Sequence, residues 1–439
     1  MFTLPSYVEE ALALLQKAGY EAYVVGGAVR DGVMHKEAHD WDITTSALPE
    51  ETEKVFAAYR LIETGLKHGT VTVLINGEPL EITTYRVDGT YTDHRRPDSV
   101  HFTSSLTDDL ARRDFTMNAM AYDPEGGLVD PFGGQTDLQN RVLRCVGEPE
   151  RRFTEDGLRI LRALRFASAM RLQLEEKTDR AVHSCKEELR QIAAERIRTE
   201  LTRLLCGPDV ERILLEYRDV LAVVMPQIRP MFDFAQHNPH HNRDVWAHTA
   251  AVVAAIPPEP VLRWAALWHD IGKPRTFFIG EDGIGHFYGH AHKSVLIAGD
   301  LLRRLRFDNA SGSEILKLIR YHDLPLQADR KQIRRLISKL GADSVRRLIE
   351  LHRADTCGQA SFCRERLPEY DRVEQLLDEI LSEPPCFTMK DLAINGHDVM
   401  ALGLSGADIG KALQKCLKAV IDEKIPNEKE ALLQYCKQQ

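Results

Sequence analysis

The spacing of apolar residues changes once along this chain of 439 residues, near residue 140. Upstream, short runs such as EAYVV, VTVLI and LEITTYRV are typical of strands, and a run from Tyr7 to Ala18 is typical of a helix that stops at Gly19. Downstream, runs such as GLRILRALRFASAM and ERIRTELTRLL repeat apolar residues every three or four positions. The sequence therefore predicts an α+β head followed by an all-helical remainder.

The length of the chain predicts more than one domain, because single cores stop growing at about 250–300 residues. We expect four regions in chain order. They are an α+β head over residues 1–140, a helical neck over 141–205, a helical body over 206–375 and a helical tail over 376–439.

The composition is typical of a globular protein outside the membrane. No apolar run approaches the ~20 residues that span a bilayer, and the N-terminus lacks the pattern of a secretion signal, so we expect a cytoplasmic protein with no membrane partner. Eight scattered cysteines without a C-x-x-C pair indicate reduced thiols. The net charge is −9, yet residues 303–353 carry 13 lysines and arginines against six acidic residues. Such a basic stretch suits phosphate contacts, or it is a solvated helix face.

An acidic pair lies in the head, in the stretch Asp40-Trp41-Asp42-Ile43. Period two on a strand would put both carboxylates on one face and the apolar side chains toward the core. Two such carboxylates can hold Mg²⁺ for phosphoryl displacement. The alternative is a pair of ordinary exposed aspartates. Glu81, in the run LEITTYRV, is a candidate third carboxylate if neighbouring strands bring it beside the pair.

A glycine turn precedes the acidic pair. Gly26 and Gly27 separate the expected strand EAYVV from a short helix that begins at Ala28, and Arg30 lies one turn into it. Glycine before a helix start lets backbone N–H groups approach phosphate, and Arg30 can reach the same anion. Glycine also serves a plain strand-to-helix turn, so this alternative stays open.

A row of charged residues marks the neck: Asp156, Arg159, Arg162 and Arg165 follow at a spacing of three, which makes successive members neighbours on one helix. Unpaired carboxylate and guanidinium groups aimed at one base would form a filter, because the first only accepts and the second only donates hydrogen bonds. Cytosine and adenine both offer an amino donor beside a ring-nitrogen acceptor. Guanine and uracil reverse that pattern and would leave buried groups unpaired at ~1–3 kcal/mol each. The alternative is an arginine-rich surface helix.

Six ordered motifs in the first 170 residues resemble those of bacterial CCA-adding enzymes, the class II tRNA nucleotidyltransferases related to bacterial poly(A) polymerases. The resemblance returns in the tail, at LAINGHDVM and PNEKE. The six motifs are GGAVRD (26–31), DWDITT (40–45), KHGTV (67–71), RRDFTMNAMAYD (112–123), DPFGG (130–134) and EDGLRILRALRF (155–166).

This resemblance implies a polymerase-β-like head with Mg²⁺ at Asp40 and Asp42. It implies nucleotide-phosphate contacts from Gly27, Arg30 and Arg113, and a protein side-chain template that agrees with the filter proposed for Asp156 and Arg159. Arg162 and Arg165 would lie nearby, against base or phosphate. The polar stretch over 88–99 is predicted to be a mobile loop, and in the family such a loop accompanies the switch from C to A addition.

The body is rich in histidine: ten of the 17 histidines lie between His237 and His352. The runs HNPHHNRDVWAHT, WHDIGKP, HFYGHAH, YHD and HRADT resemble the HD metal-dependent phosphohydrolase domain. By that resemblance His248, His269, Asp270 and Asp355 form a metal set, with His290 and His322 near it. Imidazole and carboxylate ligands suit a divalent transition metal. The alternative is a helical domain with capping or core histidines.

The function implied is addition of C, C and A to the 3′ end of tRNA from CTP and ATP, without a nucleic-acid template and with release of pyrophosphate. A poly(A) polymerase is the same-class alternative, disfavoured by KHGTV and the tail. A phosphohydrolase acting on RNA 3′ ends or nucleotides is the different-class alternative, or a second activity of the same chain. A non-catalytic RNA-binding module would need none of the motifs around Asp40 and Asp42.

Overall fold

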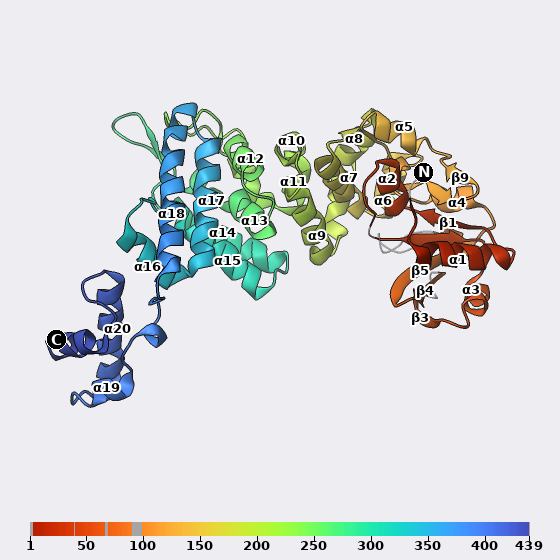
Figure 1. Ribbon diagram of the computed structural model, residues 1–439. Coiled ribbons are helices and arrows are strands. Elements are labelled where there is room, and N and C mark those ends of the chain that lie inside the picture. Colours follow the sequence, from red (N-terminus) through yellow and green to blue (C-terminus); the bar gives the residue numbers. More distant parts are fainter. Residues whose placement is uncertain (1–2, 39, 66–68, 90–98, 439) are drawn as a thin grey trace. The chain divides into compact units, whose positions relative to one another are not determined.

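The computed structural model describes residues 3–38, 40–65, 69–89 and 99–438. The chain forms two compact units (Figure 1): residues 1–209 with 216–226, and residues 210–215 with 227–439. The first contains the α+β head and neck helices, and the second is almost wholly helical, which confirms the predicted fold class. The finer division into four domains stays a prediction. Residues 90–98 of the expected loop, the beginning of KHGTV and His39 lie outside the described residues.

Seven strands of the described head form one sheet, in the order β3-β4-β5-β2-β1-β8-β9. Every neighbouring pair in it is antiparallel except β2 and β5. The strands are β1 (Ala22–Val25), β2 (Asp42–Thr45), β3 (Arg60–Gly65), β4 (Thr70–Ile75), β5 (Glu78–Thr84), β8 (Ala121–Asp123) and β9 (Gly127–Val129).

The parallel pair β2 and β5 lies at the centre of this sheet. Its register sets Asp42 opposite Glu81. Along β5, Leu80 and Ile82 are buried, so the alternation of a strand turns Glu81 toward the opposite face. The prediction that Asp40 and Asp42 share a strand is wrong, because β2 begins at Asp42 and Asp40 lies in the segment before it.

Local signals placed most of the head's elements correctly. The helix predicted for residues 7–18 is α1 (Ser6–Lys17), the glycine turn leads into α2 (Gly27–Val33), and a two-residue turn at Asn76-Gly77 joins β4 to β5. Both turn residues have positive φ, of 54° and 88°, as a two-residue hairpin with the right twist requires. The sequence reading missed β3, β8 and β9. Figure 1 shows α1 and α3 beside the sheet, where they pack on β1 and on β4 and β5 respectively.

The neck consists of short helices packed on α7, whose buried face includes Leu161 and Leu164. Asp156 is not on the same helix as the arginines that follow it: it lies between α6 and α7. The helices of the first unit are α1 (Ser6–Lys17), α2 (Gly27–Val33), α3 (Pro49–Val55), α4 (Leu106–Ala111), α5 (Gly134–Gln139), α6 (Pro149–Glu155), α7 (Leu158–Met170), α8 (Glu176–Ser184), α9 (Ala194–Leu205) and α11 (Arg218–Val224).

The second unit is built around α12, α13, α15 and α17, which pack against one another. Trp246, Trp264 and Trp268 are fully buried in its core. None of the described helices is both long and apolar enough to cross a bilayer. The main helices are α12 (Val245–Ala255), α13 (Pro260–Trp268), α14 (His290–Arg304), α15 (Asn309–Tyr321), α16 (Arg330–Leu340), α17 (Ala342–Gly358), α18 (Leu367–Ser382), α19 (Gly396–Met400), α20 (Ala407–Ile421) and α21 (Lys429–Lys437).

Candidate functional site

Three carboxylates gather at the centre of the head. Asp42 stands opposite Glu81 across the parallel strands, and Asp40 precedes Asp42 by two residues. The pKa of Asp42 is raised by loss of hydration and by the carboxylates of Glu81 and Asp40, against the opposing effect of the Arg113 guanidinium. A bound cation would relieve this like-charge repulsion, and carboxylate oxygens are the ligands that Mg²⁺ prefers. The carboxylates of these three residues do not form a group with ligand atoms within 4.8 Å of one another.

The glycine turn brings backbone and guanidinium groups to the same place. Gly26 has a φ of 73°, a conformation that L side chains rarely adopt, and it caps the start of α2. A Cβ atom added to Gly26 would lie 3.2 Å from Nη1 of Arg113. The turn therefore needs glycine both for its backbone angle and for the close approach of this arginine.

Two arginines beside the turn are held by neighbouring polar groups. Nη1 of Arg30 donates to Oδ1 of Asn118 at 2.9 Å. Arg113 lies 3.6 Å from a carboxylate oxygen of Asp109, which is fully buried and also accepts from Thr44 of β2. Nε of Arg113 is buried and makes no hydrogen bond to the described residues, which is rare for a buried donor.

A cavity of about 480 Å³ joins the glycine turn to the neck. It brings together six of the predicted nucleotide-binding residues with Asp42, while Arg165, Asp40 and Glu81 are outside its lining. The lining residues are Gly26, Gly27, Arg30, Asp42, Arg86, Arg112, Arg113, Asp114, Asn118, Asp156, Leu158, Arg159, Arg162, Phe166 and Arg196.

The expected base filter is paired within the protein, which corrects the prediction of unpaired groups. Oδ2 of Asp156 accepts from Arg196 at 3.0 Å, and its Oδ1 accepts from the backbone N–H of Leu158 at 3.0 Å. Arg159 donates to Glu155 at 2.9 Å. Arg159 also donates to the backbone carbonyls of Arg152 and Arg112, at 3.2 and 3.3 Å, so both side chains are held in a fixed orientation.

The other two arginines of the row have structural partners. Arg162 donates twice to Asp114, at 2.8 and 2.6 Å. Although burial acts to raise it, the Arg162 guanidinium and the Asn118 amide lower the pKa of Asp114 to about 2. Arg165 pairs with Glu200 at 2.9 Å and lies over the ring of Phe166, 3.9 Å from its centroid. Arg165 is therefore turned away from the cavity.

Asp114, Asn118 and Arg196 are among the lining residues of this site that the sequence did not predict. Asp114 and Asn118 stand in the motif RRDFTMN, from which only Arg113 was selected, so a signal for them was present. Arg196 lies 40 residues beyond Asp156 on α9, and no local pattern connects the two.

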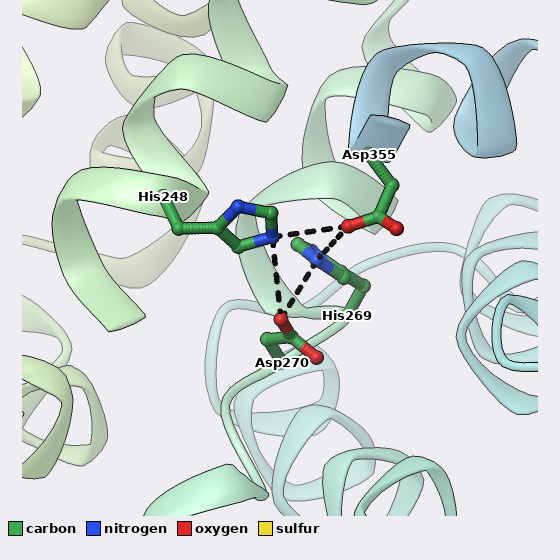
Figure 2. Close-up of side chains that lie close together, drawn as sticks. All are labelled: His248, His269, Asp270 and Asp355. Atoms are coloured by element: carbon green, nitrogen blue, oxygen red, sulfur yellow. Dashed lines mark hydrogen bonds and ion pairs between the residues drawn. The ribbon is translucent and has the colours of Figure 1, made fainter. Parts of the chain in front are cut away.

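A second candidate site lies in the helical unit, where four predicted metal ligands come together (Figure 2). His248 comes from α12, His269 and Asp270 follow α13, and Asp355 comes from α17. Nε2 of His248 is 3.0 Å from Asp355 and 3.5 Å from Asp270, and Nε2 of His269 is 3.6 and 3.1 Å from the same two carboxylates. The ligand atoms of all four lie within 4.8 Å of one another.

Backbone carbonyls orient both imidazoles of this cluster. Nδ1 of His248 contacts the carbonyl of Gly358 at 3.2 Å, and Nδ1 of His269 contacts that of Ala266 at 2.7 Å. A carbonyl only accepts, so we assign the proton to Nδ1, and Nε2 of each neutral ring points at the carboxylates as a metal ligand would.

The two carboxylates of the cluster, Asp270 and Asp355, favour a positive charge between them. Nε2 of His269 and Oδ2 of Asp270 are buried without a hydrogen bond of good geometry, although they lie 3.1 Å apart. Burial opposes charging of the ring, yet the carboxylates of Asp270 and Asp355 outweigh it and raise the pKa of His269 to about 10. A proton supplies that charge on the ring, and a divalent cation would supply it equally. The donor set therefore fits a metal ion.

Three protein-family models match successive parts of the chain. Residues 22–144 match the family described as poly A polymerase head domain, residues 171–232 match the probable RNA and SrmB-binding site of polymerase A, and residues 297–436 match tRNA nucleotidyltransferase domain 2.

Relatives and a solved structure cover nearly the whole chain. A CCA-adding enzyme of Lactobacillus helveticus is 33% identical over 98% of this chain and 97% of its own length, and one of Levilactobacillus brevis is 35% identical over 98% of both. The crystal structure of the Bacillus stearothermophilus CCA-adding enzyme in complex with CTP is 30% identical, with a TM-score of 0.74 over 99% of this chain and 98% of that one. The chain belongs to the CCA-adding enzymes, the class II tRNA nucleotidyltransferases of the tRNA nucleotidyltransferase and poly(A) polymerase family.

Proposed function

We propose that this protein adds C, C and A to the 3′ end of tRNA from CTP and ATP, with release of pyrophosphate and without a nucleic-acid template. The observation that carries the proposal is the single cavity lined by Asp42 together with Asp156 and Arg159. Transfer chemistry and base selection would then act on one bound nucleotide. All eight cysteines are free thiols, which supports a cytoplasmic location.

The reaction needs charge neutralisation at the triphosphate. Mg²⁺ held by Asp40 and Asp42, with Glu81 as the third carboxylate, would supply that charge and favour ionisation of the attacking hydroxyl. The tRNA 3′ hydroxyl loses its proton to solvent as its oxygen bonds to the α-phosphorus of the nucleotide. The bond from that phosphorus to the bridging oxygen breaks, and pyrophosphate leaves with its electron pair. The raised pKa of Asp42 supports its place beside a cation.

The triphosphate would be held by the glycine turn and two arginines. The backbone at Gly27 begins α2, and Arg30 and Arg113 line the same cavity as Asp42. A guanidinium fork can hold phosphate by two parallel hydrogen bonds, so the contacts of Arg30 and Arg113 with Asn118 and Asp109 serve to aim these forks.

Selection of C and A would be made by Asp156 and Arg159. Their contacts with Arg196 and Glu155 orient both side chains at the cavity, where a carboxylate would accept a hydrogen bond from an amino group and a guanidinium would donate one to a ring nitrogen. Arg162 lines the cavity near them, whereas the ion pair of Arg165 with Glu200 favours a structural role for Arg165.

Replacement of Asp42 tests the transfer centre. Asp42→Ala should lower incorporation of CTP and ATP into tRNA lacking CCA by more than about a hundredfold, because a metal ligand is lost, while tRNA binding survives. Primer extension and a filter-binding assay measure the two quantities.

Glu78→Ala is the matched control, since this exposed carboxylate lies on the same strand as Glu81 and should leave incorporation unchanged. The parent chain should extend tRNA by C, C and A and leave oligo(A) unextended. Extension of oligo(A) with A alone would support a poly(A) polymerase instead, and full activity of Asp42→Ala would remove Asp42 from the mechanism.

Replacement of the filter residues tests base selection. Asp156→Ala and Arg159→Ala should reduce discrimination against UTP and GTP by about tenfold to a hundredfold, because each unpaired buried group costs ~1–3 kcal/mol. The ratio of kcat/KM for CTP and UTP, measured on one tRNA, checks this. Arg180→Ala is the control, since this exposed arginine of the neck pairs with Glu176 and does not line the cavity. Unchanged selectivity in both filter variants would assign the template to other groups.

A second candidate activity is favoured by the cluster of His248, His269, Asp270 and Asp355. A divalent transition metal held there would lower the pKa of a bound water and polarise a phosphoryl oxygen. The corresponding reaction is phosphoester hydrolysis at RNA 3′ ends or on nucleotides: the water oxygen bonds to phosphorus while the bond to the leaving oxygen breaks.

The two activities should separate by mutation and by metal removal. With Mn²⁺ or Ni²⁺, the chain should hydrolyse p-nitrophenyl phosphate, Asp270→Asn should abolish this hydrolysis, and Asp42→Ala should retain it. A transition-metal chelator should stop hydrolysis, and incorporation with excess Mg²⁺ should persist. Release of p-nitrophenolate gives the rate. Hydrolysis that survives Asp270→Asn would refute the assignment.

A further inference from the structure

An exposed group of aromatic side chains lies on the hairpin between α13 and α14. The hairpin consists of β12 (Phe278–Ile279) and β13 (Gly285–His286), which pair antiparallel with Phe278 opposite His286. The ring centroids of Phe278 and His286 lie 5.3 Å apart, and that of Tyr288 lies 5.3 Å from His286 and 5.5 Å from Phe278. These three residues are called the aromatic platform below.

The platform is more exposed than the stability of the hairpin requires. Tyr288 is 74% exposed and Phe278 is 44% exposed. A cross-strand pair of rings stabilises a short hairpin, which accounts for Phe278 and His286. It does not account for Tyr288, which lies two residues beyond the end of β13. Exposed apolar side chains that cluster, rather than lie singly, mark interaction sites.

The other side of the hairpin is fixed to the helical unit. Phe277 packs against Phe234 and Phe287, whose ring centroids lie 5.2 and 5.4 Å away. The backbone N–H of Gly285 donates to the carbonyl of His237 at 2.7 Å. The aromatic platform is therefore carried by an anchored backbone, with its rings already gathered, and a ligand would not have to order them.

A cavity of about 300 Å³ connects the platform with the metal cluster. Its lining includes His286 and Tyr288 of the platform together with Asp270 and Asp355 of the cluster. The chain also joins the two directly, since His290 follows Tyr288 by two residues and its Nε2 lies 3.3 Å from Asp270. A base on the platform and a phosphate at the cluster could therefore belong to one RNA strand.

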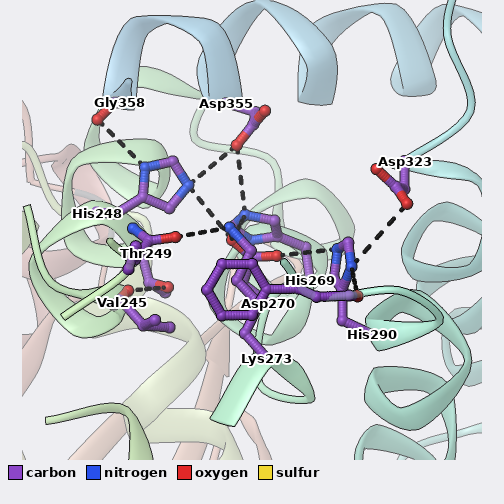
Figure 3. A network of polar contacts seen from close by, with 12 residues as sticks. Val245, His248, Thr249, His269, Asp270, Lys273, His290, Asp323, Asp355 and Gly358 are labelled. Carbon is purple, nitrogen blue, oxygen red and sulfur yellow. Dashed lines mark hydrogen bonds and ion pairs between the residues drawn. The ribbon is translucent and has the colours of Figure 1, made fainter. Parts of the chain in front are cut away.

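A buried lysine adds positive charge to the same cavity. Nζ of Lys273 lies 2.7 Å from Asp270 and 5.2 Å from the ring centroid of Phe287, the residue before Tyr288. Figure 3 shows Lys273 beside Asp270. The lining of the cavity thus combines aromatic faces with a cation, which is the combination that binds the bases and phosphates of single-stranded nucleic acid.

An unpaired nucleobase fits these features. Aromatic side chains stack on the splayed-out bases of single-stranded RNA, and an open surface admits a base that is attached to a longer strand. CCA-adding enzymes act on the 3′ end of tRNA, so the chain meets such an end. We propose that Phe278, His286 and Tyr288 bind the unpaired base at the 3′ end of an RNA strand and so position the neighbouring phosphoester at the metal cluster. The reaction in this proposal rests on the second candidate activity, whereas binding of the base needs no metal.

Photo-crosslinking locates the base in the absence of metal. The chelator-treated full-length chain is irradiated with a short oligoribonucleotide that ends in 4-thiouridine, and the labelled peptides are identified by mass spectrometry. Residues 277–289 should carry the label. In Tyr288→Ala this label should reach half-saturation at an oligonucleotide concentration about fivefold to a hundredfold higher, because stacking on one ring is lost. Tyr288→Phe keeps the ring and should behave as the parent chain does.

Ile279→Ala is the matched control. Its side chain is also exposed and apolar, but the alternation of a strand turns it to the face opposite Phe278, so its labelling should equal that of the parent. A parent chain labelled only in the head would overturn the proposal, as would the same half-saturation in Tyr288→Ala and the parent. Labelling by 4-thiouridine monophosphate at the same concentration would assign the platform to free nucleotides and overturn the assignment to an RNA end.

Hydrolysis kinetics separate the platform from the activity on which it builds. The substrate is an oligoribonucleotide with a 3′ phosphate, supplied with Mn²⁺: the water oxygen bonds to phosphorus, and the 3′ oxygen leaves and takes a proton from that water. Tyr288→Ala should raise KM by the same factor and leave kcat unchanged, because the platform binds the base and not the reacting atoms. A fall in kcat at unchanged KM would overturn this role. A parent chain without hydrolysis, whose labelling still depends on Tyr288, would remove the second activity and support the platform as an RNA-binding site.

Discussion

The head depends on the parallel pairing of β2 with β5. Its register puts Asp42 against Glu81, and a parallel pair requires a crossover, which the chain makes through α3, β3 and β4. The same strand carries Thr44, which holds the buried Asp109, and Asp109 in turn contacts Arg113. This one strand pairing therefore sets two carboxylates side by side and, through two further contacts, holds Arg113 in place.

The two candidate centres share one physical feature. Side chains that repel one another are kept close together by backbone hydrogen bonds. In the head, strand hydrogen bonds keep the carboxylates of Asp42 and Glu81 adjacent. In the helical unit, the backbone carbonyls of Gly358 and Ala266 accept hydrogen bonds from Nδ1 of His248 and His269, so Nε2 of each ring faces the carboxylates. Because the fold already holds these side chains in place, a cation that bound there would meet ligands that are already oriented.

The sequence predicted the features that depend on neighbouring residues in the chain. The acidic pair, the glycine turn, the helical remainder and the metal-type histidines were all identified, although the strand was expected to include Asp40. The features that depend on distant partners were not predicted. The strands β3, β8 and β9 are short, and their local residue patterns do not indicate which strands they pair with. Arg196 contacts Asp156, which lies 40 residues earlier in the chain. The carbonyls that orient the histidines have no side-chain signature at all, so no reading of residue types could have found them.

The last turn of α17 does two things for the metal cluster. Asp355 supplies a ligand oxygen, and three residues later the carbonyl of Gly358 fixes the tautomer of His248. Gly358 can do this because any Cβ there would lie 2.7 Å from a methyl carbon of Val252 and 3.1 Å from Nδ1 of His248. Fraying of that single turn would withdraw both contributions together. An ion bound at the cluster would therefore stabilise the last turn of α17, and fraying of that turn would lower the affinity for the ion.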